Sequence, residues 1–132
     1  MEFSMTRKDL LKPFAIATGM GIVAVMVVWA IASALGVDFT VSTLGMPIPA
    51  PAFVIFSIVG GVGAWVVSGF LLSTKTPRKT GQIVGWLVLV ASIAAPLSGT
   101  TDLAAIVAIM ATHFAIGVPL IMAMGKHLPV TK

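Results

Sequence analysis

Four long apolar runs constrain the fold of this chain more than any other feature. The clearest, residues 103–125, is long enough to cross a bilayer, whose hydrocarbon core of about 30 Å needs about 20 residues of helix. Three further runs, at about 13–35, 50–72 and 82–97, precede it. In lipid, a helix satisfies every backbone polar group within the segment. We therefore predict a single transmembrane domain over residues 1–132, an all-α integral membrane four-helix bundle.

Composition supports a membrane protein. Hydrophobic residues make up 58% of the chain and charged residues 9%, whereas about a quarter of the residues of a soluble domain are charged. The absence of cysteine excludes disulfides and thiolate-ligated metals. The net charge of +4 comes from short basic clusters beside the apolar runs. This arrangement favours contact with an anionic membrane surface over binding to nucleic acid.

The charged residues outside the apolar runs predict the topology. All eight basic residues lie at the two ends of the chain or between the second and third runs: Arg7, Lys8, Lys12, Lys75, Arg78, Lys79, Lys126 and Lys132. The two opposite connections carry only Asp38 and Asp102. By the positive-inside rule both termini face the cytoplasm. We expect an N-in/C-in, multi-pass protein of the bacterial inner membrane.

The start of the chain has two interpretations. Met5, followed by a basic cluster, is expected to be the native start, with residues 1–4 an addition ahead of it. Alternatively, residues 7–12 form the basic region of a signal peptide that is cleaved after Ala32-Ser33-Ala34. The apolar stretch at 13–35 exceeds the 7–15 residues usual for a signal peptide. We therefore expect an uncleaved first span.

Turn residues predict where the spans begin. Pro13 is expected at the start of the first helix, where its missing N–H costs nothing. The connection 37–49 is too apolar for a free loop and should lie against the end of the bundle. Thr100 or Thr101 is expected to cap the fourth helix, with Asp102 near the positive end of its dipole.

Small residues predict which helix faces pack together. In the second span the small side includes Gly60, Gly61, Ala64 and Ser68, and in the fourth it includes Ala108 and Ala111. Small residues let helix backbones approach closely in lipid, so we expect a packed seam at the glycines rather than a pore or ligand gap. The alanine stripe lies almost opposite His113 and faces lipid, a flanking helix, or a second copy in a homo-oligomer.

His113 is the only ionisable side chain inside an apolar run, and polar groups at this depth turn inward. Asp102 shares its face but lies eleven residues away, about 16 Å at 1.5 Å per residue. The simpler interpretation has Asp102 capping its helix and His113 hydrogen-bonded to Ser57, Ser92 or a backbone carbonyl. The alternative is a polar path for protons or ions. Counting from the outer ends places His113 level with residues 87–88 of the third span, and with Gly60 and Gly61 of the second.

Few other chemistries are available to this sequence. His113 and His127 are too far apart to share a metal site. Haem ligation by His113 alone has no supporting feature, and we expect no cofactor. A hydrolase would need a nucleophile and a base within reach, and only a Ser or Thr beside His113 could supply them. We expect no catalytic site, and hence a protein that is not an enzyme.

Two stretches near the C-terminus resemble a known family. They are Ser92-Ile93-Ala94-Ala95-Pro96-Leu97-Ser98 with Thr100-Thr101, and Met110-Ala111-Thr112-His113 with Gly117-Val118-Pro119. They are similar to a family of small bacterial four-span membrane proteins that carries only a domain-of-unknown-function label. The resemblance is clearest over the last two spans, and it implies the four-span topology without a mechanism.

The function expected from these features is that of a small integral membrane protein with a structural, accessory or interaction role. Its expected partners are the lipid bilayer and, as possibilities from the alanine stripe, a second copy or another membrane protein. The alternative is a transporter or channel component with His113 in a polar intramembrane path. A membrane enzyme ranks third.

Overall fold

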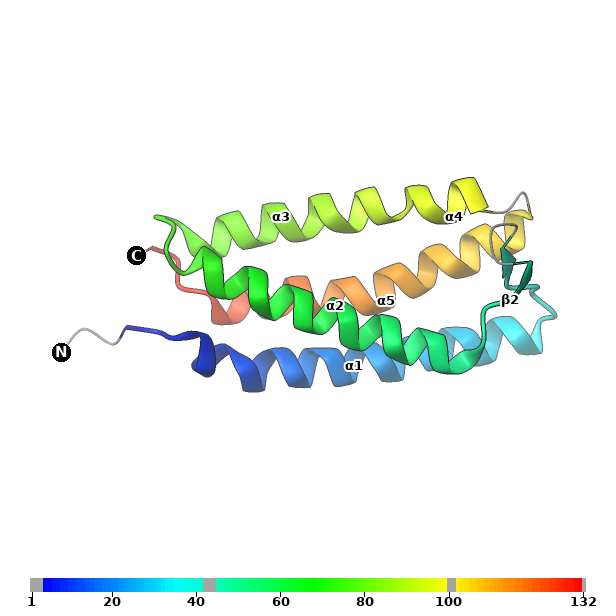
Figure 1. Cartoon of the computed structure of the whole chain (residues 1–132), viewed down its shortest axis with the longest axis horizontal. Helices are drawn as coiled ribbons and strands as arrows, with labels where there is room; N and C mark the ends of the chain where they lie inside the picture. Colours follow the sequence, from blue (N-terminus) through cyan, green and yellow to red (C-terminus); the bar gives the residue numbers. More distant parts are fainter. Residues whose placement is uncertain (1–3, 42–44, 100–101, 132) are drawn as a thin grey trace.

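The protein is a multi-pass membrane four-helix bundle, which confirms the predicted all-α fold. A computed structural model describes residues 4–41, 45–99 and 102–131. The elements in chain order are α1 (Arg7–Ala34), β1 (Thr40–Val41), β2 (Met46–Pro47), α2 (Ala50–Leu71), α3 (Pro77–Ser92), α4 (Ala94–Gly99) and α5 (Leu103–His127). The start of α1, the α2–α3 turn and the end of α5 lie at one end of the bundle, and the short β1–β2 pair lies at the other (Figure 1).

Helix α1 begins at Arg7, so the expectation that Pro13 starts it is wrong. The Asp9 carboxylate accepts hydrogen bonds from the Thr6 backbone N–H at 2.7 Å and from Thr6 Oγ1 at 2.8 Å. These bonds close the first turn ahead of the apolar run. Pro13 lies inside the helix, where it supplies no N–H to the carbonyl four residues earlier.

The third span is longer than the predicted 82–97. It covers Pro77–Gly99 as two helices, α3 and α4, separated by a break at Ile93. Pro96 accounts for the break, because it has no N–H for the Ser92 carbonyl and its ring crowds that group. The prediction used apolar content alone, so it missed the polar first turn of the span, which lies before the apolar run.

The described residues of the connection between α1 and α2 pack against the end of the bundle where β1 and β2 lie, as expected for residues 37–49. Phe39 is buried and meets Phe53 edge to face, with ring centroids 5.6 Å apart. Val37 and Ile48 pack against the same core cluster. These aromatic and aliphatic contacts fix the start of α2 relative to α1.

Helix α5 is at the centre of the bundle. It packs along α1 on one side and along α3 on the other, while α2 packs mainly along α1. Ala108 of α5 is buried in a core cluster with Val25 of α1, and Ala111 is half-buried. Gly21 of α1 allows a close backbone approach, since a methyl group there would lie 3.4 Å from Ile116 Cα. Of the three neighbours expected for the alanine stripe, Ala108 therefore faces the flanking helix.

The small side of α2 is divided between two neighbours. Its buried members are Ser57, Gly61 and Ser68, and Ala64 is half-buried. Gly61 faces α1, where a methyl group would collide with the Thr18 side chain. Gly60 instead faces α5, where a methyl group would lie 3.4 Å from Ile116 Cγ2. Gly60 thus packs beside Ile116, about one turn further along α5 than His113, and is not level with His113.

Candidate functional site

A groove lies between α2 and α3, with α5 as its floor. Helices α2 and α3 make few contacts with each other, and the space between them has a volume of about 820 Å³. This volume is within the range of about 300–1,000 Å³ of small-molecule sites. Phe56 and Val59 of α2 and Val88 of α3 border it and are each more than half exposed. The groove is therefore open at its side, between α2 and α3.

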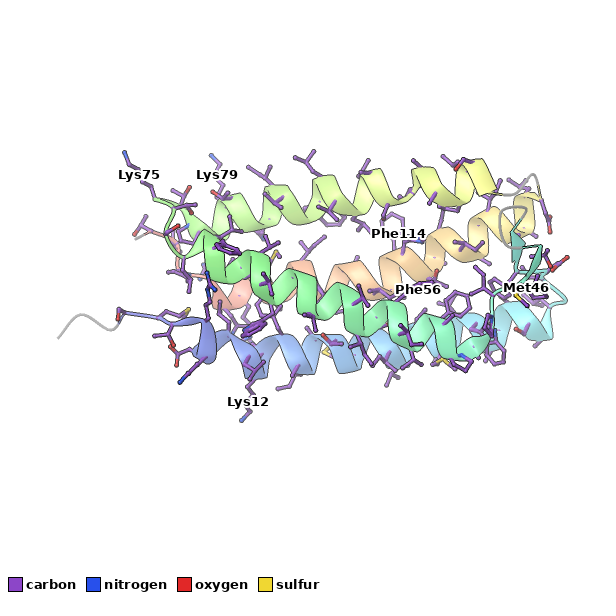
Figure 2. All side chains as sticks on the ribbon, viewed as in Figure 1. Lys12, Met46, Phe56, Lys75, Lys79 and Phe114 are labelled. Carbon is purple, nitrogen blue, oxygen red and sulfur yellow. The ribbon has the colours of Figure 1, made fainter. Side chains whose placement is uncertain are left out.

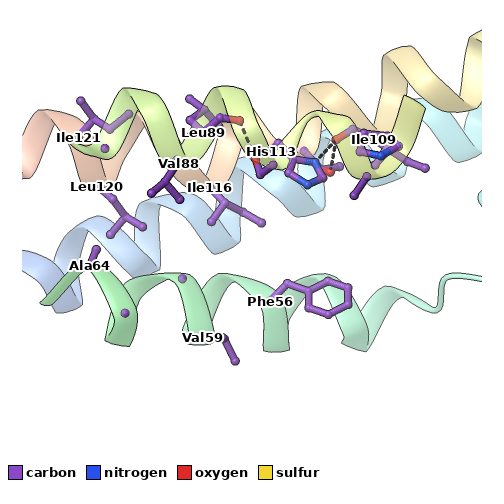
Figure 3. A pocket seen from close by; sticks show the side chains of 18 of the residues that line it. Phe56, Val59, Ala64, Val88, Leu89, Ile109, His113, Ile116, Leu120 and Ile121 are labelled. Carbon is purple, nitrogen blue, oxygen red and sulfur yellow. Dashed lines mark hydrogen bonds between the residues drawn. The ribbon is translucent and has the colours of Figure 1, made fainter. Parts of the chain in front are cut away.

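His113 lines this groove from α5 and is half-buried. Its Nδ1 lies 2.7 Å from the carbonyl oxygen of Ile109, one turn earlier on the same helix (Figure 3). Thr112 Oγ1 donates to the same carbonyl at 2.6 Å. A carbonyl oxygen can only accept, so Nδ1 carries the proton in this bond. The backbone carbonyl, one of three partners predicted for His113, is the one it has here.

The two predicted serine partners make other hydrogen bonds. Ser92 lines the groove with His113, but its hydroxyl donates to the Leu89 carbonyl at 2.6 Å. Ser57 is buried outside the groove lining and donates to the Phe53 carbonyl at 2.8 Å. Back-bonding of this kind satisfies the serine hydroxyls within their own helices.

Asp102 is the N-cap of α5, and its carboxylate accepts from the Ala104 backbone N–H at 3.2 Å. Thr100 and Thr101, predicted for this role, lie outside the described residues. The structure thus brings together His113 and Ser92 of the predicted polar site. It does not place Asp102 or Ser57 in the groove lining.

The depth of His113 relative to α3 differs from the prediction. A methyl group on Gly117 would lie 2.9 Å from Leu89 Cδ1, so these two residues are in contact. Because α3 runs antiparallel to α5, His113, one turn before Gly117, lies toward the end of α3 beyond Leu89 and not beside residues 87–88. The prediction counted inward from residue 97, whereas the span ends at Gly99, and this accounts for two residues of the difference.

The packing residues predicted on α2 include one unsatisfied polar atom. Ser68 Oγ is fully buried and has no hydrogen-bond partner among the described residues. Nearby, Trp65 Nε1 donates to the Arg7 carbonyl at 2.9 Å, and the Arg7 guanidinium lies 4.4 Å from the Phe70 ring centroid. The C-terminal end of α2 is therefore held to the start of α1 by a hydrogen bond and a cation–π contact.

Comparison with known proteins identifies the family. A family model described as a family of unknown function (DUF6069) matches residues 5–129, which include all four spans. The chain belongs to this family. Comparisons with curated proteins and with solved structures gave no match. The DUF6069 description assigns no activity, so the groove is the feature of this chain that points to a function.

The floor of the groove in this DUF6069 member depends on glycines that the sequence analysis missed. Methyl groups on Gly81 and Gly85 of α3 would lie 2.7 Å from Leu128 Cδ1 and 2.8 Å from Ile121 Cγ1. Gly117 of α5 receives Leu89 in the same way. The signal was present as two glycines four residues apart, a spacing typical of close helix packing in membranes. This seam holds α3 against α5.

No group of three or more His, Asp or Glu side chains in the described ranges could hold a metal ion.

Proposed function

We propose that this protein is a non-enzymatic accessory protein of the bacterial inner membrane whose groove binds the apolar chain of a membrane lipid. The observation that carries the proposal is the lateral groove of about 820 Å³ between α2 and α3. Its walls are mostly apolar side chains and glycines, and the helices that form it are long and apolar enough to span a membrane. A wall without partner atoms loses dispersion contacts, so a lipid chain stabilises such a groove by filling it.

Binding fits the polar groups of the groove better than catalysis does. Nucleophilic catalysis needs a hydroxyl in hydrogen-bond contact with its base. Ser92 and Thr112 line the groove with His113, but their hydroxyls donate to backbone carbonyls instead. In the described part of the chain, no hydroxyl is hydrogen-bonded to the imidazole.

A polar transport path has less support than lipid binding. It would need further polar groups in line with His113, and Asp102 is the candidate from the sequence. Asp102 caps α5 about 16 Å from His113 and does not line the groove. The groove opens toward lipid instead of connecting these two residues.

The proposed orientation places both termini in the cytoplasm. Lys12, Lys75 and Lys79 lie toward one end of the bundle and Met46 lies at the other (Figure 2). Basic residues of multi-pass proteins gather on the cytoplasmic side, where anionic lipids attract them. The acidic Asp38 and Asp102 are in the connections at the opposite end.

Cysteine labelling tests this orientation directly, because the chain contains no cysteine of its own. Met46→Cys and Thr76→Cys each place one thiol at an exposed position, at opposite ends of the bundle. In intact cells, a membrane-impermeant maleimide is expected to label Met46→Cys, and to label Thr76→Cys only after permeabilisation. The reverse pattern would overturn the orientation.

Filling the groove tests the proposed function. A methyl group on Gly63 meets no atom within 4 Å, so Gly63→Phe extends a phenyl group into the groove without a clash at its base. Native mass spectrometry of protein purified in mild detergent is expected to show about tenfold less retained lipid in Gly63→Phe than in the unchanged protein. Tenfold corresponds to about 1.4 kcal/mol of binding free energy.

Gly19→Phe is the matched control. A methyl group on Gly19 also meets no atom within 4 Å, but Gly19 is on α1 and outside the groove lining. The Gly19→Phe variant is expected to retain as much lipid as the unchanged protein. Equal lipid retention in all three proteins would contradict the proposal, and a dimer that Gly63→Phe alone dissociates would show that a second copy fills the groove instead.

A further inference from the structure

The polar side chains on the groove wall share one property: each donates its proton within its own helix. In the described part of the lining, each bond goes to a backbone carbonyl: from Ser92 to Leu89 at 2.6 Å, from Ser98 to Ala95 at 3.0 Å, from Thr112 to Ile109 at 2.6 Å and from His113 to Ile109 at 2.7 Å. A hydroxyl whose proton is used this way keeps only acceptor lone pairs. The wall therefore offers hydrogen-bond acceptors to a ligand, while its hydrogen-bond donors are already used within the helices.

His113 is the strongest of these acceptors. With the proton on Nδ1 and bonded to Ile109, the neutral ring has its lone pair on Nε2. The Nδ1–Ile109 bond is the only hydrogen bond of the ring among the described residues.

The floor of the groove continues from His113 as an apolar track. Gly117, Leu120, Ile121 and Met124 line it at helical spacing on the same face of α5. The track from His113 to Met124 is eleven residues long, about 16 Å at 1.5 Å per residue. An extended hydrocarbon chain can lie along it toward the inner end of the bundle.

We infer that the ligand is a neutral long-chain lipid with an O–H or N–H donor in its head, bound by His113 Nε2 with its chain along α5 toward Met124. This inference rests on the proposed function and specifies its ligand. A carboxylate or phosphate would bring acceptors and a charge into a wall that presents acceptors, and a buried unpaired charge is costly. An ether or ester head lacks the donor that the wall requires.

A pair of probes isolates the donor. 1-Tetradecanol and its methyl ether have the same chain and the same oxygen, but only the alcohol donates a hydrogen bond. Competition against tritiated 1-tetradecanol in nanodiscs gives the affinity of the protein for each. The unchanged protein is expected to prefer the alcohol by about 2- to 12-fold, the range that a hydrogen bond contributes.

The His113→Leu variant is expected to bind both probes but to lose the preference for the alcohol. Equal affinity of the unchanged protein for alcohol and ether would overturn the inference without any substitution, as would a preference that survives in a folded His113→Leu. Gly63→Phe separates the two proposals, because it should weaken both probes equally. If it weakens neither, the proposed function itself fails.

Discussion

Replacing Gly61 by alanine is expected to lower the free energy of unfolding by about 1–3 kcal/mol, the usual cost of overpacking a close contact. Gly61 packs against Thr18 where α2 meets α1, and the added methyl group would lie 2.9 Å from both Cβ and Cγ2 of Thr18 and closer still to Oγ1. Rotation of the threonine cannot remove the contact with Cβ, which the backbone of α1 fixes. Rotation would also break the hydrogen bond of 2.7 Å from Thr18 Oγ1 to the Phe14 carbonyl. The two helices must therefore move apart.

Gly63→Ala provides the matched control two residues along the same helix. Its methyl group meets nothing within 4 Å, so the better helix propensity of alanine is expected to stabilise the protein by up to about 1 kcal/mol. The two glycine-to-alanine changes thus have opposite expected signs. Unfolding in mixed detergent–SDS micelles, followed by circular dichroism, measures both.

Thr18→Gly should suppress the effect of Gly61→Ala, since it removes all three contacting atoms. In a double-mutant cycle the two changes should then cost less together than the sum of their separate costs. Equal effects of Gly61→Ala and Gly63→Ala, or strict additivity with Thr18→Gly, would contradict the α1–α2 seam described here.

The number and type of the helices could be predicted from the sequence because both follow from local properties. A run of about 20 apolar residues has few ways to satisfy its backbone in lipid other than a helix. The residues at which the helices start were harder to predict, since they depend on polar caps outside the apolar runs. Asp9 and Thr6 start α1 before Pro13, and Pro77 starts α3 five residues before the predicted residue 82.

The groove could not be predicted from the sequence, although the inward position of His113 could. A groove between α2 and α3 exists only because α3 packs on α5 rather than on α2. That choice is made by reciprocal contacts between Gly85 and Ile121 and between Gly117 and Leu89, which a pattern within one helix does not reveal. The hydrogen bond of His113 to its own helix was one of three predicted options, and only the structure distinguishes them.

Leu128→Ala is expected to lower the free energy of unfolding by about 2–5 kcal/mol, as for other buried leucines truncated to alanine. Leu128 follows the last turn of α5 and is fully buried, with its side chain in the space that Gly81 leaves on α3. Arg78 holds the same segment through two bonds, from Nε to the Leu128 carbonyl at 2.9 Å and from its backbone N–H to the Pro129 carbonyl at 3.0 Å. Truncation leaves a cavity in the core cluster that includes Leu10.

Digestion by a carboxypeptidase separates a loosened C-terminal segment from a general loss of stability. When opening is fast, the digestion rate follows the population of the open form, so a local loss of 2 kcal/mol should raise it about 30-fold. Val130→Ala is the control, because this side chain is 58% exposed and its truncation should change stability by less than about 0.5 kcal/mol. If Leu128→Ala and Val130→Ala are digested at the same rate, Leu128 does not anchor the segment. The anchor then consists of the Arg78 bonds alone, and the cost assigned to Leu128 belongs to the interior of the bundle.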